Sequence, residues 1–177
     1  IIKTWNGWET MKILVTGATG FLGKYVIDEL LAHDYSIVAF GRNEKIGKAL
    51  EGERVQFIKG DLSSIEELRQ AFQSVDAVVH AGALSTAWGP WKAFYQANVV
   101  GTQNVLDLCR EYAVKRLVYV SSPSIYAAGK DQLNIKESDA PKENHLNNYI
   151  RSKLASEKLF SDYSDVPSII LRPRGLF

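Results

Sequence analysis

The 177-residue chain is long enough for one well-cored domain and too short for two, and its 46% hydrophobic residues are ordinary for a globular protein. Its 21 basic and 20 acidic side chains nearly cancel, so the net charge of +1 gives no sign of a nucleic-acid or membrane-surface partner. The longest apolar runs are strand-sized and exclude a membrane-spanning helix. Cys109, the single cysteine, has no partner for an internal disulfide, which predicts a reducing, cytoplasmic location.

Residues 1–10 precede Met11 and lack the basic-then-apolar order of a signal peptide. We interpret them as a cloning remnant, an upstream extension or a short native arm, and we place a single domain at residues 11–177.

Short β-branched runs and longer helical stretches alternate along the rest of the chain. In chain order we expect a strand at 12–16, a helix at 21–33, a strand at 36–40, a helix at 44–50, a strand at 55–59, a helix at 63–72 capped by Ser63 or Ser64, a strand at 76–80, one long helix at 91–112, a strand at 116–120, a polar stretch at 130–148, a helix at 149–163 and a strand at 168–171. Such alternation predicts an α/β fold with a doubly wound parallel sheet, which here ends after the sixth strand.

A glycine-rich turn, TGATGFLG at residues 16–23, joins the first strand to the first helix. Gly17 permits a tight turn, Gly20 lets the backbone approach a pyrophosphate, and Gly23 allows close packing of helix against strand. The helix N-terminus then holds the anion. The candidate cofactor contacts are Gly17, Thr19, Gly20, Phe21, Leu22 and Gly23. The alternative is a structural turn that binds nothing.

The residues after the second and third strands bear on which dinucleotide is bound. Sites that prefer NAD usually place an acidic residue after the second strand, where this chain has Gly41 and Arg42. The Arg42 guanidinium suits a 2′-phosphate, so NADP(H) is favoured and NAD(H) remains possible; otherwise Arg42 stacks on the adenine or faces water. Asp61 and Leu62 are predicted to bracket the adenine, unless Asp61 only caps the following turn.

Tyr149 and Lys153 lie four residues apart at the start of a predicted helix, so they share a face. An ammonium beside a phenol favours the phenolate, and such a pair can exchange a proton with a hydroxyl or ketone. The pair alone is common in helices. Ser122 follows the fifth strand, where a hydroxyl can stabilise a substrate oxygen; a nucleophilic role is disfavoured because no strand-turn-helix elbow surrounds it.

Taken together, the motifs resemble the extended short-chain dehydrogenase/reductase family, also called the NAD-dependent epimerase/dehydratase family, which has a Rossmann fold. The matching segments are TGATGFLG, GDL at 60–62, HAGA at 80–83, NVVGTQNV at 98–105, YVSSPSIY at 119–126, YIRSK at 149–153 and LRP at 171–173. The resemblance implies that Ser122 binds the substrate oxygen, Tyr149 is the acid/base and Lys153 binds the cofactor ribose. It further implies that Ala81, Gly82 and Ala83 line the cofactor and that Pro173 approaches the nicotinamide. Asn98 either buttresses the sheet, which is favoured, or takes part in the chemistry.

The stretch at 85–95 looks most like the 3β-hydroxysteroid dehydrogenase and 3-oxo-acyl reductase branch of that family. Trp88 and Trp91 either line an apolar substrate pocket or seal the sheet edge. The resemblance also implies a homodimer formed through the helices at 91–112 and 149–163. Family members continue past the sixth strand into a substrate domain, so we expect a truncated clone or gene fragment that keeps cofactor binding better than turnover.

The sequence favours an NAD(P)-dependent oxidoreductase that moves a hydride between nicotinamide and a small-molecule secondary alcohol or ketone by a Ser-Tyr-Lys mechanism. A nucleotide-sugar epimerase or dehydratase uses the same residues, and a non-catalytic NADP(H)-binding regulator is the third hypothesis. His33, His80 and His145 are scattered along the chain, so no metal site is predicted.

Overall fold

The structure, a computed structural model, describes residues 10–86 and 88–174. Its strands form one six-stranded parallel sheet in the order β3-β2-β1-β4-β5-β6. The strands are β1 (Lys12–Thr16), β2 (Ser36–Gly41), β3 (Val55–Lys59), β4 (Ala77–His80), β5 (Arg116–Val120) and β6 (Ser168–Leu171). The strand order reverses between β1 and β4, which confirms the Rossmann-type doubly wound sheet.

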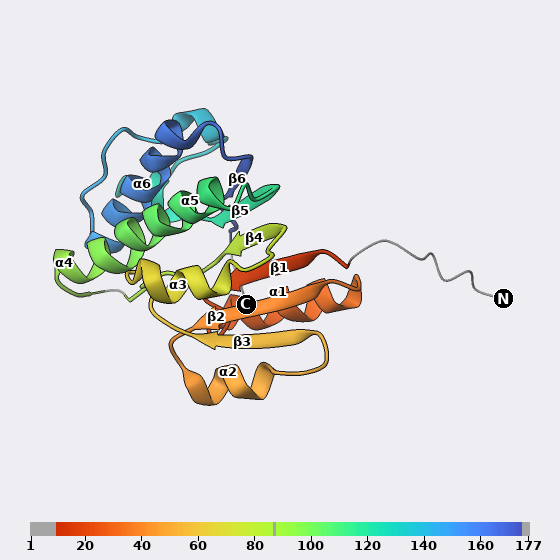
Figure 1. The fold of residues 1–177 in the computed structure, drawn as a ribbon. Coiled ribbons are helices and arrows are strands. Elements are labelled where there is room, and N and C mark those ends of the chain that lie inside the picture. Colours follow the sequence, from red (N-terminus) through yellow and green to blue (C-terminus); the bar gives the residue numbers. More distant parts are fainter. Residues whose placement is uncertain (1–9, 87, 175–177) are drawn as a thin grey trace.

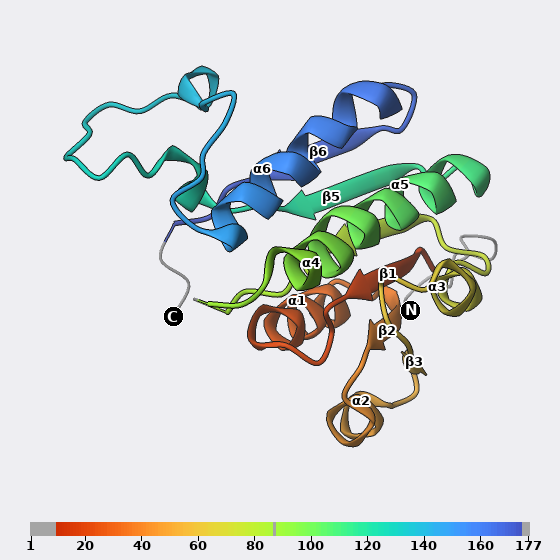
Figure 2. The same cartoon turned by 90° about the vertical axis from the view of Figure 1, so that its left-hand side faces the viewer.

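The helical elements connect these strands and cover the sheet (Figures 1 and 2). They are α1 (Phe21–Ala32), α2 (Glu44–Leu50), α3 (Ile65–Ala71), α4 (Trp91–Phe94), η1 (Tyr95–Val100), α5 (Gly101–Glu111), η2 (Pro123–Tyr126), η3 (Glu137–Asp139), α6 (Asn148–Leu159) and η4 (Phe160–Tyr163). The strands at 12–16, 55–59, 116–120 and 168–171 and the helix at 44–50 match their predicted bounds. Residues 1–9 and 175–177, which bear on the interpretation of the chain's two ends, lie outside the described residues.

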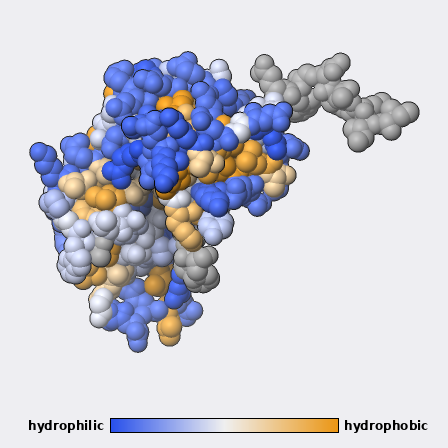
Figure 3. All heavy atoms as spheres, turned by 90° about the horizontal axis from the view of Figure 1, so that it is seen from below, coloured by the Kyte–Doolittle hydropathy of each residue, from blue (hydrophilic) through white to orange (hydrophobic). Residues whose placement is uncertain are grey.

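Alternate side chains of the central strands point to opposite faces and build two cores. Leu14 of β1 packs in a cluster with α3, α5 and the end of α6, whereas Ile13 and Val15 pack in a second cluster with α1 and α2. The sheet is therefore buried on both faces at its centre, as strands of nearly continuous apolar residues require. From below, hydrophobic surface appears in separate patches among hydrophilic side chains (Figure 3).

The helix predicted at 91–112 is not α-helical along its whole length. The helical run is continuous, but it contains a π-helical stretch, η1, between α4 and α5. This wider turn holds the buried side chain of Asn98, which bonds both backbone groups of Leu84. Because these bonds join residues distant in sequence, local periodicity gave no signal for the wider turn. π-Helical turns occur often at functional sites.

Smaller differences concern where elements begin and end. β4 begins at Ala77 rather than at 76, and α3 begins at Ile65 because Ser64 is the N-cap, its hydroxyl accepting a hydrogen bond from the Glu67 amide at 3.4 Å. The last predicted helix begins at Asn148 and tightens into the 3₁₀ segment η4 after Leu159.

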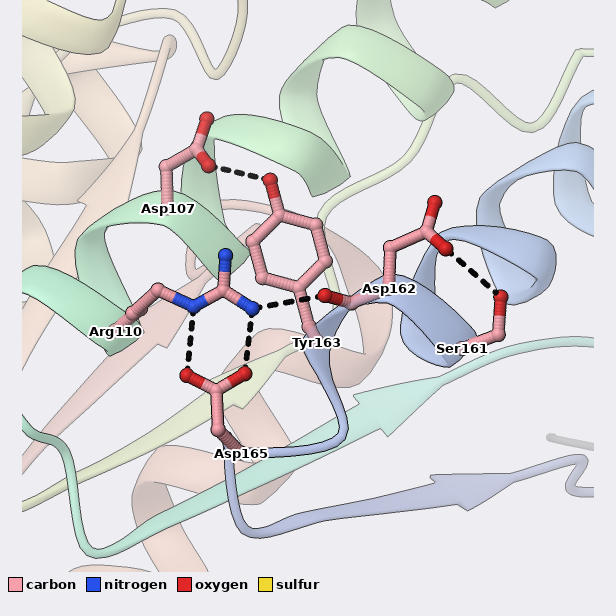
Figure 4. Close-up of polar contacts among 6 residues, drawn as sticks. All are labelled: Asp107, Arg110, Ser161, Asp162, Tyr163 and Asp165. Carbon is pink, nitrogen blue, oxygen red and sulfur yellow. Dashed lines mark hydrogen bonds and ion pairs between the residues drawn. The ribbon is translucent and has the colours of Figure 1, made fainter.

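A polar cluster ties the connection between α6 and β6 to α5 (Figure 4). Arg110 of α5 donates two hydrogen bonds to the Asp165 carboxylate and a third, of 2.8 Å, to the carbonyl of Asp162. Its guanidinium lies 4.2 Å from the centre of the Tyr163 ring, and the Tyr163 hydroxyl bonds Asp107. The cluster fixes the far end of α6, and thereby the helix that carries Tyr149 and Lys153.

Candidate active site

A pocket of about 440 Å³ opens at the carboxyl ends of the parallel strands. Ligands bind at this edge in doubly wound sheets, at the point where the strand order reverses. The pocket is lined by most of the predicted site residues: Gly17, Thr19, Gly20, Phe21, Leu22, Gly23, Arg42, Asp61, Leu62, Ala81, Gly82, Ala83, Tyr149 and Lys153. It is also lined by residues that the sequence did not single out as site residues: Phe40, Gly41, Gly60, Ser85, Ala97, Val120 and Ser121.

The glycine turn forms a cradle that side chains would fill. Gly17 has a φ of +71°, and a Cβ added there would lie 2.6 Å from Cα of Gly82. A Cβ on Gly23 would lie 2.3 Å from the carbonyl oxygen of Gly17, so α1 could not approach the turn as closely. α1 begins after Gly20 with no side-chain cap and no acidic residue in its first turn. Its first amides are therefore open to an anion.

A buried hydrogen-bonded chain holds the loop after β4 against this turn. The Gly82 amide donates to Thr16 Oγ1 at 3.3 Å, and the Thr16 hydroxyl shares a hydrogen bond of 2.6 Å with His80 Nδ1. The other ring nitrogen of His80, Nε2, shares a hydrogen bond of 3.0 Å with Thr102 Oγ1. Burial, with a smaller effect of Lys153, lowers the pKa of His80 to about 3. His80 is thus a neutral structural residue.

Arg42 and Asp61 face each other at the end of the pocket near β2 and β3. The guanidinium and the carboxylate lie 3.8 Å apart, and 68% of the Arg42 side chain is exposed. Burial alone would raise the pKa of Asp61, but hydrogen bonds from the amide and hydroxyl of Ser63, with the charge of Arg42, hold it below its usual range. Asp61 thus caps the following turn and also lines the pocket.

Tyr149 and Lys153 line the opposite end of the pocket, in the first turns of α6. Lys153 is only 2% exposed, and its Nζ donates to the carbonyl of Val120 at 2.8 Å and lies 4.3 Å from the centre of the Tyr119 ring. Burial lowers the pKa of Lys153 to about 8, against the opposing effects of Tyr149 and Glu157. A lysine with such a pKa both holds and releases a proton near neutral pH.

Two predicted site residues lie outside the pocket lining. Ser122 is the N-cap of η2, and its hydroxyl shares hydrogen bonds with the amide and hydroxyl of Ser124. The preceding residue, Ser121, is the serine that lines the pocket. Pro173 follows Arg172, whose guanidinium bonds the carboxylate of Glu157 at 2.6 and 3.0 Å. This ion pair joins the end of β6 to α6, and no local sequence pattern indicates it.

Asn98 joins Leu84, in the loop after β4, to the helix that carries Tyr149 and Lys153. Its side chain accepts from the Leu84 amide at 2.7 Å and donates to the Leu84 carbonyl at 3.0 Å. The same amide group donates to Ser152 Oγ at 2.8 Å, and Ser152 in turn donates to the carbonyl of Tyr149. Asn98 therefore fixes two walls of the pocket relative to each other.

The two tryptophans of the stretch at 85–95 do not line this pocket. Trp88 is 88% exposed. Trp91 is the first residue of α4, and its ring stacks against α6, where the guanidinium of Arg151 lies 3.9 Å from the ring centre. Among residues 10–86 and 88–174, no group of three His, Cys, Asp or Glu side chains is placed to hold a metal ion. No helix within the described part of the chain is both long and apolar enough to cross a membrane.

Comparisons with known proteins agree with this geometry. The chain is 36% identical over 148 residues to the 2-alkyl-3-oxoalkanoate reductase of Shewanella oneidensis, a match that covers 84% of this chain and 38% of that protein. It is 29% identical over 180 residues to the decarboxylating sterol-4-alpha-carboxylate 3-dehydrogenase of Homo sapiens, covering 99% of this chain and 47% of that protein. The chain thus spans about half the length, or less, of these curated relatives.

The fold is shared with solved structures that contain NAD. The UDP-glucose 4-epimerase of Thermus thermophilus, in complex with NAD, superposes with a TM-score of 0.81 at 26% identity, over 92% of this chain and 54% of the epimerase. The model of the NAD dependent epimerase/dehydratase family matches residues 13–177, which is nearly the whole of the predicted domain. The chain therefore belongs to the NAD-dependent epimerase/dehydratase family.

Proposed function

We propose that this chain forms the cofactor-binding part of an NADP(H)-dependent reductase or dehydrogenase acting on a secondary alcohol or ketone. One observation carries the proposal: a single pocket is lined by the glycine turn, by Arg42 at one end and by the Tyr149–Lys153 pair at the other. The open amides of α1 and the side-chain-free cradle at Gly17 fit a pyrophosphate. When bound, the nicotinamide would supply or accept the hydride.

The preference for NADP(H) rests on Arg42 and on the residue before it. A Cβ on Gly41 would lie 2.7 Å from Thr19 Oγ1, so an acidic side chain of the kind typical of NAD sites would require Thr19 to move at the end of β2. The exposed guanidinium of Arg42 is instead available to a 2′-phosphate, with Asp61 close enough to orient it. Solved structures of similar fold contain NAD, and Arg42 is the feature in which we expect this chain to differ.

Proton transfer would use groups that the fold already holds in place. Tyr149 would exchange a proton with the substrate oxygen, and the buried Lys153 would favour the phenolate and hand on the proton. Lys153 is held by the Val120 carbonyl, so its charge stays beside the pocket. Ser122 would turn its hydroxyl from Ser124 to the substrate oxygen. The Arg172–Glu157 pair keeps α6 against the end of β6 while this happens.

The names of the relatives favour a ketone or secondary alcohol as substrate, because they describe a reductase of 3-oxoalkanoates and a sterol 3-dehydrogenase. A nucleotide-sugar epimerase or dehydratase is the second candidate, and the similarity to the NAD-bound epimerase fold favours it. A regulator that binds the cofactor without chemistry would have no need of an acid/base pair such as Tyr149 and Lys153. We further propose a cytoplasmic homodimer joined through α4, α5 and α6, to be checked by sedimentation of the purified protein.

The cofactor proposal is tested by calorimetric titration of the chain with NADPH and NADH. We expect NADPH to bind more tightly, and Arg42→Ala to weaken NADPH by about tenfold or more, the value of a charge-assisted hydrogen bond, while NADH changes less than about twofold. Arg54→Ala is the matched control, because Arg54 directly precedes β3, at the amino edge of the sheet, where it pairs with Asp34. Tighter binding of NADH would overturn the cofactor preference, and binding of neither would overturn the cofactor site itself.

The reaction class is tested by net cofactor consumption. With a 2-alkyl-3-oxoalkanoic acid, a reductase oxidises one NADPH for each substrate molecule, which is followed as a loss of NADPH absorbance. Tyr149→Phe should abolish this loss. An epimerase returns the hydride to the same substrate and consumes no net cofactor. Conversion of a nucleotide sugar in the presence of NAD⁺ or NADP⁺, with no net reduction of the cofactor, would therefore replace the reductase proposal with the epimerase one.

A further inference from the structure

Two neighbouring residues of β5 hold the ammonium of Lys153. The carbonyl of Val120 accepts a hydrogen bond from Nζ at 2.8 Å, and the centre of the Tyr119 ring lies 4.3 Å from the same nitrogen. Lys153 is 2% exposed and Tyr119 is 1% exposed, so water does not screen this contact. A cation over the face of an aromatic ring is attracted by the quadrupole of the ring, and the attraction is strongest where both groups are desolvated.

The ring of Tyr119 is itself fixed by two other rings. His80 is its register partner on β4, and the two ring centres lie 5.3 Å apart. Phe160, which directly follows α6, lies 5.1 Å away between ring centres. Burial raises the pKa of the Tyr119 phenol and lowers the pKa of the His80 imidazole, so both rings are neutral near neutral pH. Lys153 therefore meets a ring face whose place is set by β4 and α6 and whose attraction for a cation does not depend on a charge.

The carboxylate that acts on Lys153 already has a partner. Glu157, one turn further along α6, favours the charged form of Lys153, as Tyr149 does, but both of its oxygens bond the guanidinium of Arg172. Other charged or titratable side chains on α6, on β5 and on the elements packed against α6 are exposed or bonded elsewhere: Lys92, Tyr95, Arg116, Arg151, Lys158 and Asp162 are exposed, Tyr126 bonds Arg172, and Asp107, Arg110 and Glu111 bond Tyr163, Asp165 and Arg69. The direct contacts that hold the ammonium are thus the carbonyl and the ring of β5.

We propose that Tyr119 is a positioning residue: its ring face holds the ammonium of Lys153 in place and keeps it charged beside Tyr149. The inference rests on the proposed roles of Tyr149 and Lys153 and deepens them, because it names the group that keeps the lysine in the form that favours the phenolate. Tyr119 is not among the residues that line the pocket, so it acts through Lys153. Burial by itself favours the neutral form of a lysine, and the ring opposes it.

The test changes the π electrons of the ring and keeps its shape. Tyr119→Phe retains the ring face, whereas para-fluorophenylalanine and trifluorophenylalanine, inserted at position 119 through a reassigned stop codon, withdraw π electrons with little change in volume. Each protein is compared with its own Lys153→Met partner by urea unfolding between about pH 6 and pH 10. The stability difference within a pair begins to rise where the folded chain releases the Lys153 proton, because the unfolded chain still holds that proton.

We expect the rise to begin at the same pH, within about 0.3 unit, in the wild type and in Tyr119→Phe, because both keep an electron-rich ring face. Along the fluorine series it should begin at progressively lower pH, by about one unit for the trifluorinated ring, as the loss of a desolvated cation–π contact requires. A ring that only fills space would give the same pH throughout the series, since the volume hardly changes.

The same fluorinated residues at position 72 are the matched control. Phe72 is as buried as Tyr119, but it packs against Tyr112 in the core under α3 and α5. They should leave the start of the rise at its wild-type pH. A start that does not move along the position 119 series, or that moves as far in the position 72 series, would overturn the inference. The measurement uses no cofactor, so failure of the wild-type chain to bind NADPH would overturn the proposed function and leave the contact between Tyr119 and Lys153 standing.

Discussion

Replacement of Lys153 by methionine should change how the stability of the chain depends on pH. Lys153 is 2% exposed, and its Nζ is held by the Val120 carbonyl at 2.8 Å and by the face of the Tyr119 ring. These contacts offset only part of the cost of burial, which lowers the pKa of Lys153 from 10.5 to about 8. Lys153→Met keeps much of the volume and removes the titrating group.

The sign follows from proton binding. Between pH 8 and 10.5 the folded chain has released the proton of Lys153 while the unfolded chain still holds it. The unfolded state thus binds one more proton, and stability rises with pH by about 1.4 kcal/mol per unit over this range. The difference between a pKa of 10.5 and one of about 8 corresponds to about 3 kcal/mol in full. Below pH 8 both states are protonated and this contribution is flat.

Urea unfolding of wild type and Lys153→Met between pH 7 and 9.5 measures this effect, because other titrating groups cancel in the difference. From pH 8 to 9.5 the wild type should gain about 2 kcal/mol on the variant, or about 4–8 °C in melting temperature. Lys158→Met, a change at an exposed lysine of the same helix, should track the wild type throughout. Parallel stability profiles for wild type and Lys153→Met would refute the argument that burial drives the shift.

Two further predictions concern stability and packing. Arg110→Ala should lower the urea midpoint of unfolding, and a double-mutant cycle with Asp165→Ala should show effects that are less than additive, since the two side chains form an ion pair. Strictly additive effects in urea unfolding would refute a working ion pair. Gly23→Ala should destabilise the chain by about 1–3 kcal/mol and abolish cofactor binding, because its Cβ would meet backbone at 2.3 Å. Gly52→Ala, with nothing within 4 Å of its Cβ, is the control, and equal cofactor affinity in both variants would contradict the close approach of α1 to the turn.

Local sequence patterns determined the fold and most of the pocket. The strands at 12–16 and 116–120 are continuous apolar runs, and only a parallel sheet covered on both faces buries such runs. Residues that directly follow these strands necessarily meet at the carboxyl edge of the sheet. For this reason the glycine turn after β1 and Arg42 after β2 line one pocket, whereas Tyr149 and Lys153 reach it from the first turns of α6.

The tertiary structure alone decided which of two consecutive serines lines that pocket. Both Ser121 and Ser122 follow β5, and their side chains leave the backbone in different directions, so the choice depends on the hydrogen bonds that β6 and η2 make with them. The π-helical turn around Asn98 likewise depends on bonds to Leu84 and Ser152, which are 14 and 54 residues away. Hydrophobic periodicity indicates only which face of an element is apolar. These features depend instead on contacts between elements that are far apart along the chain.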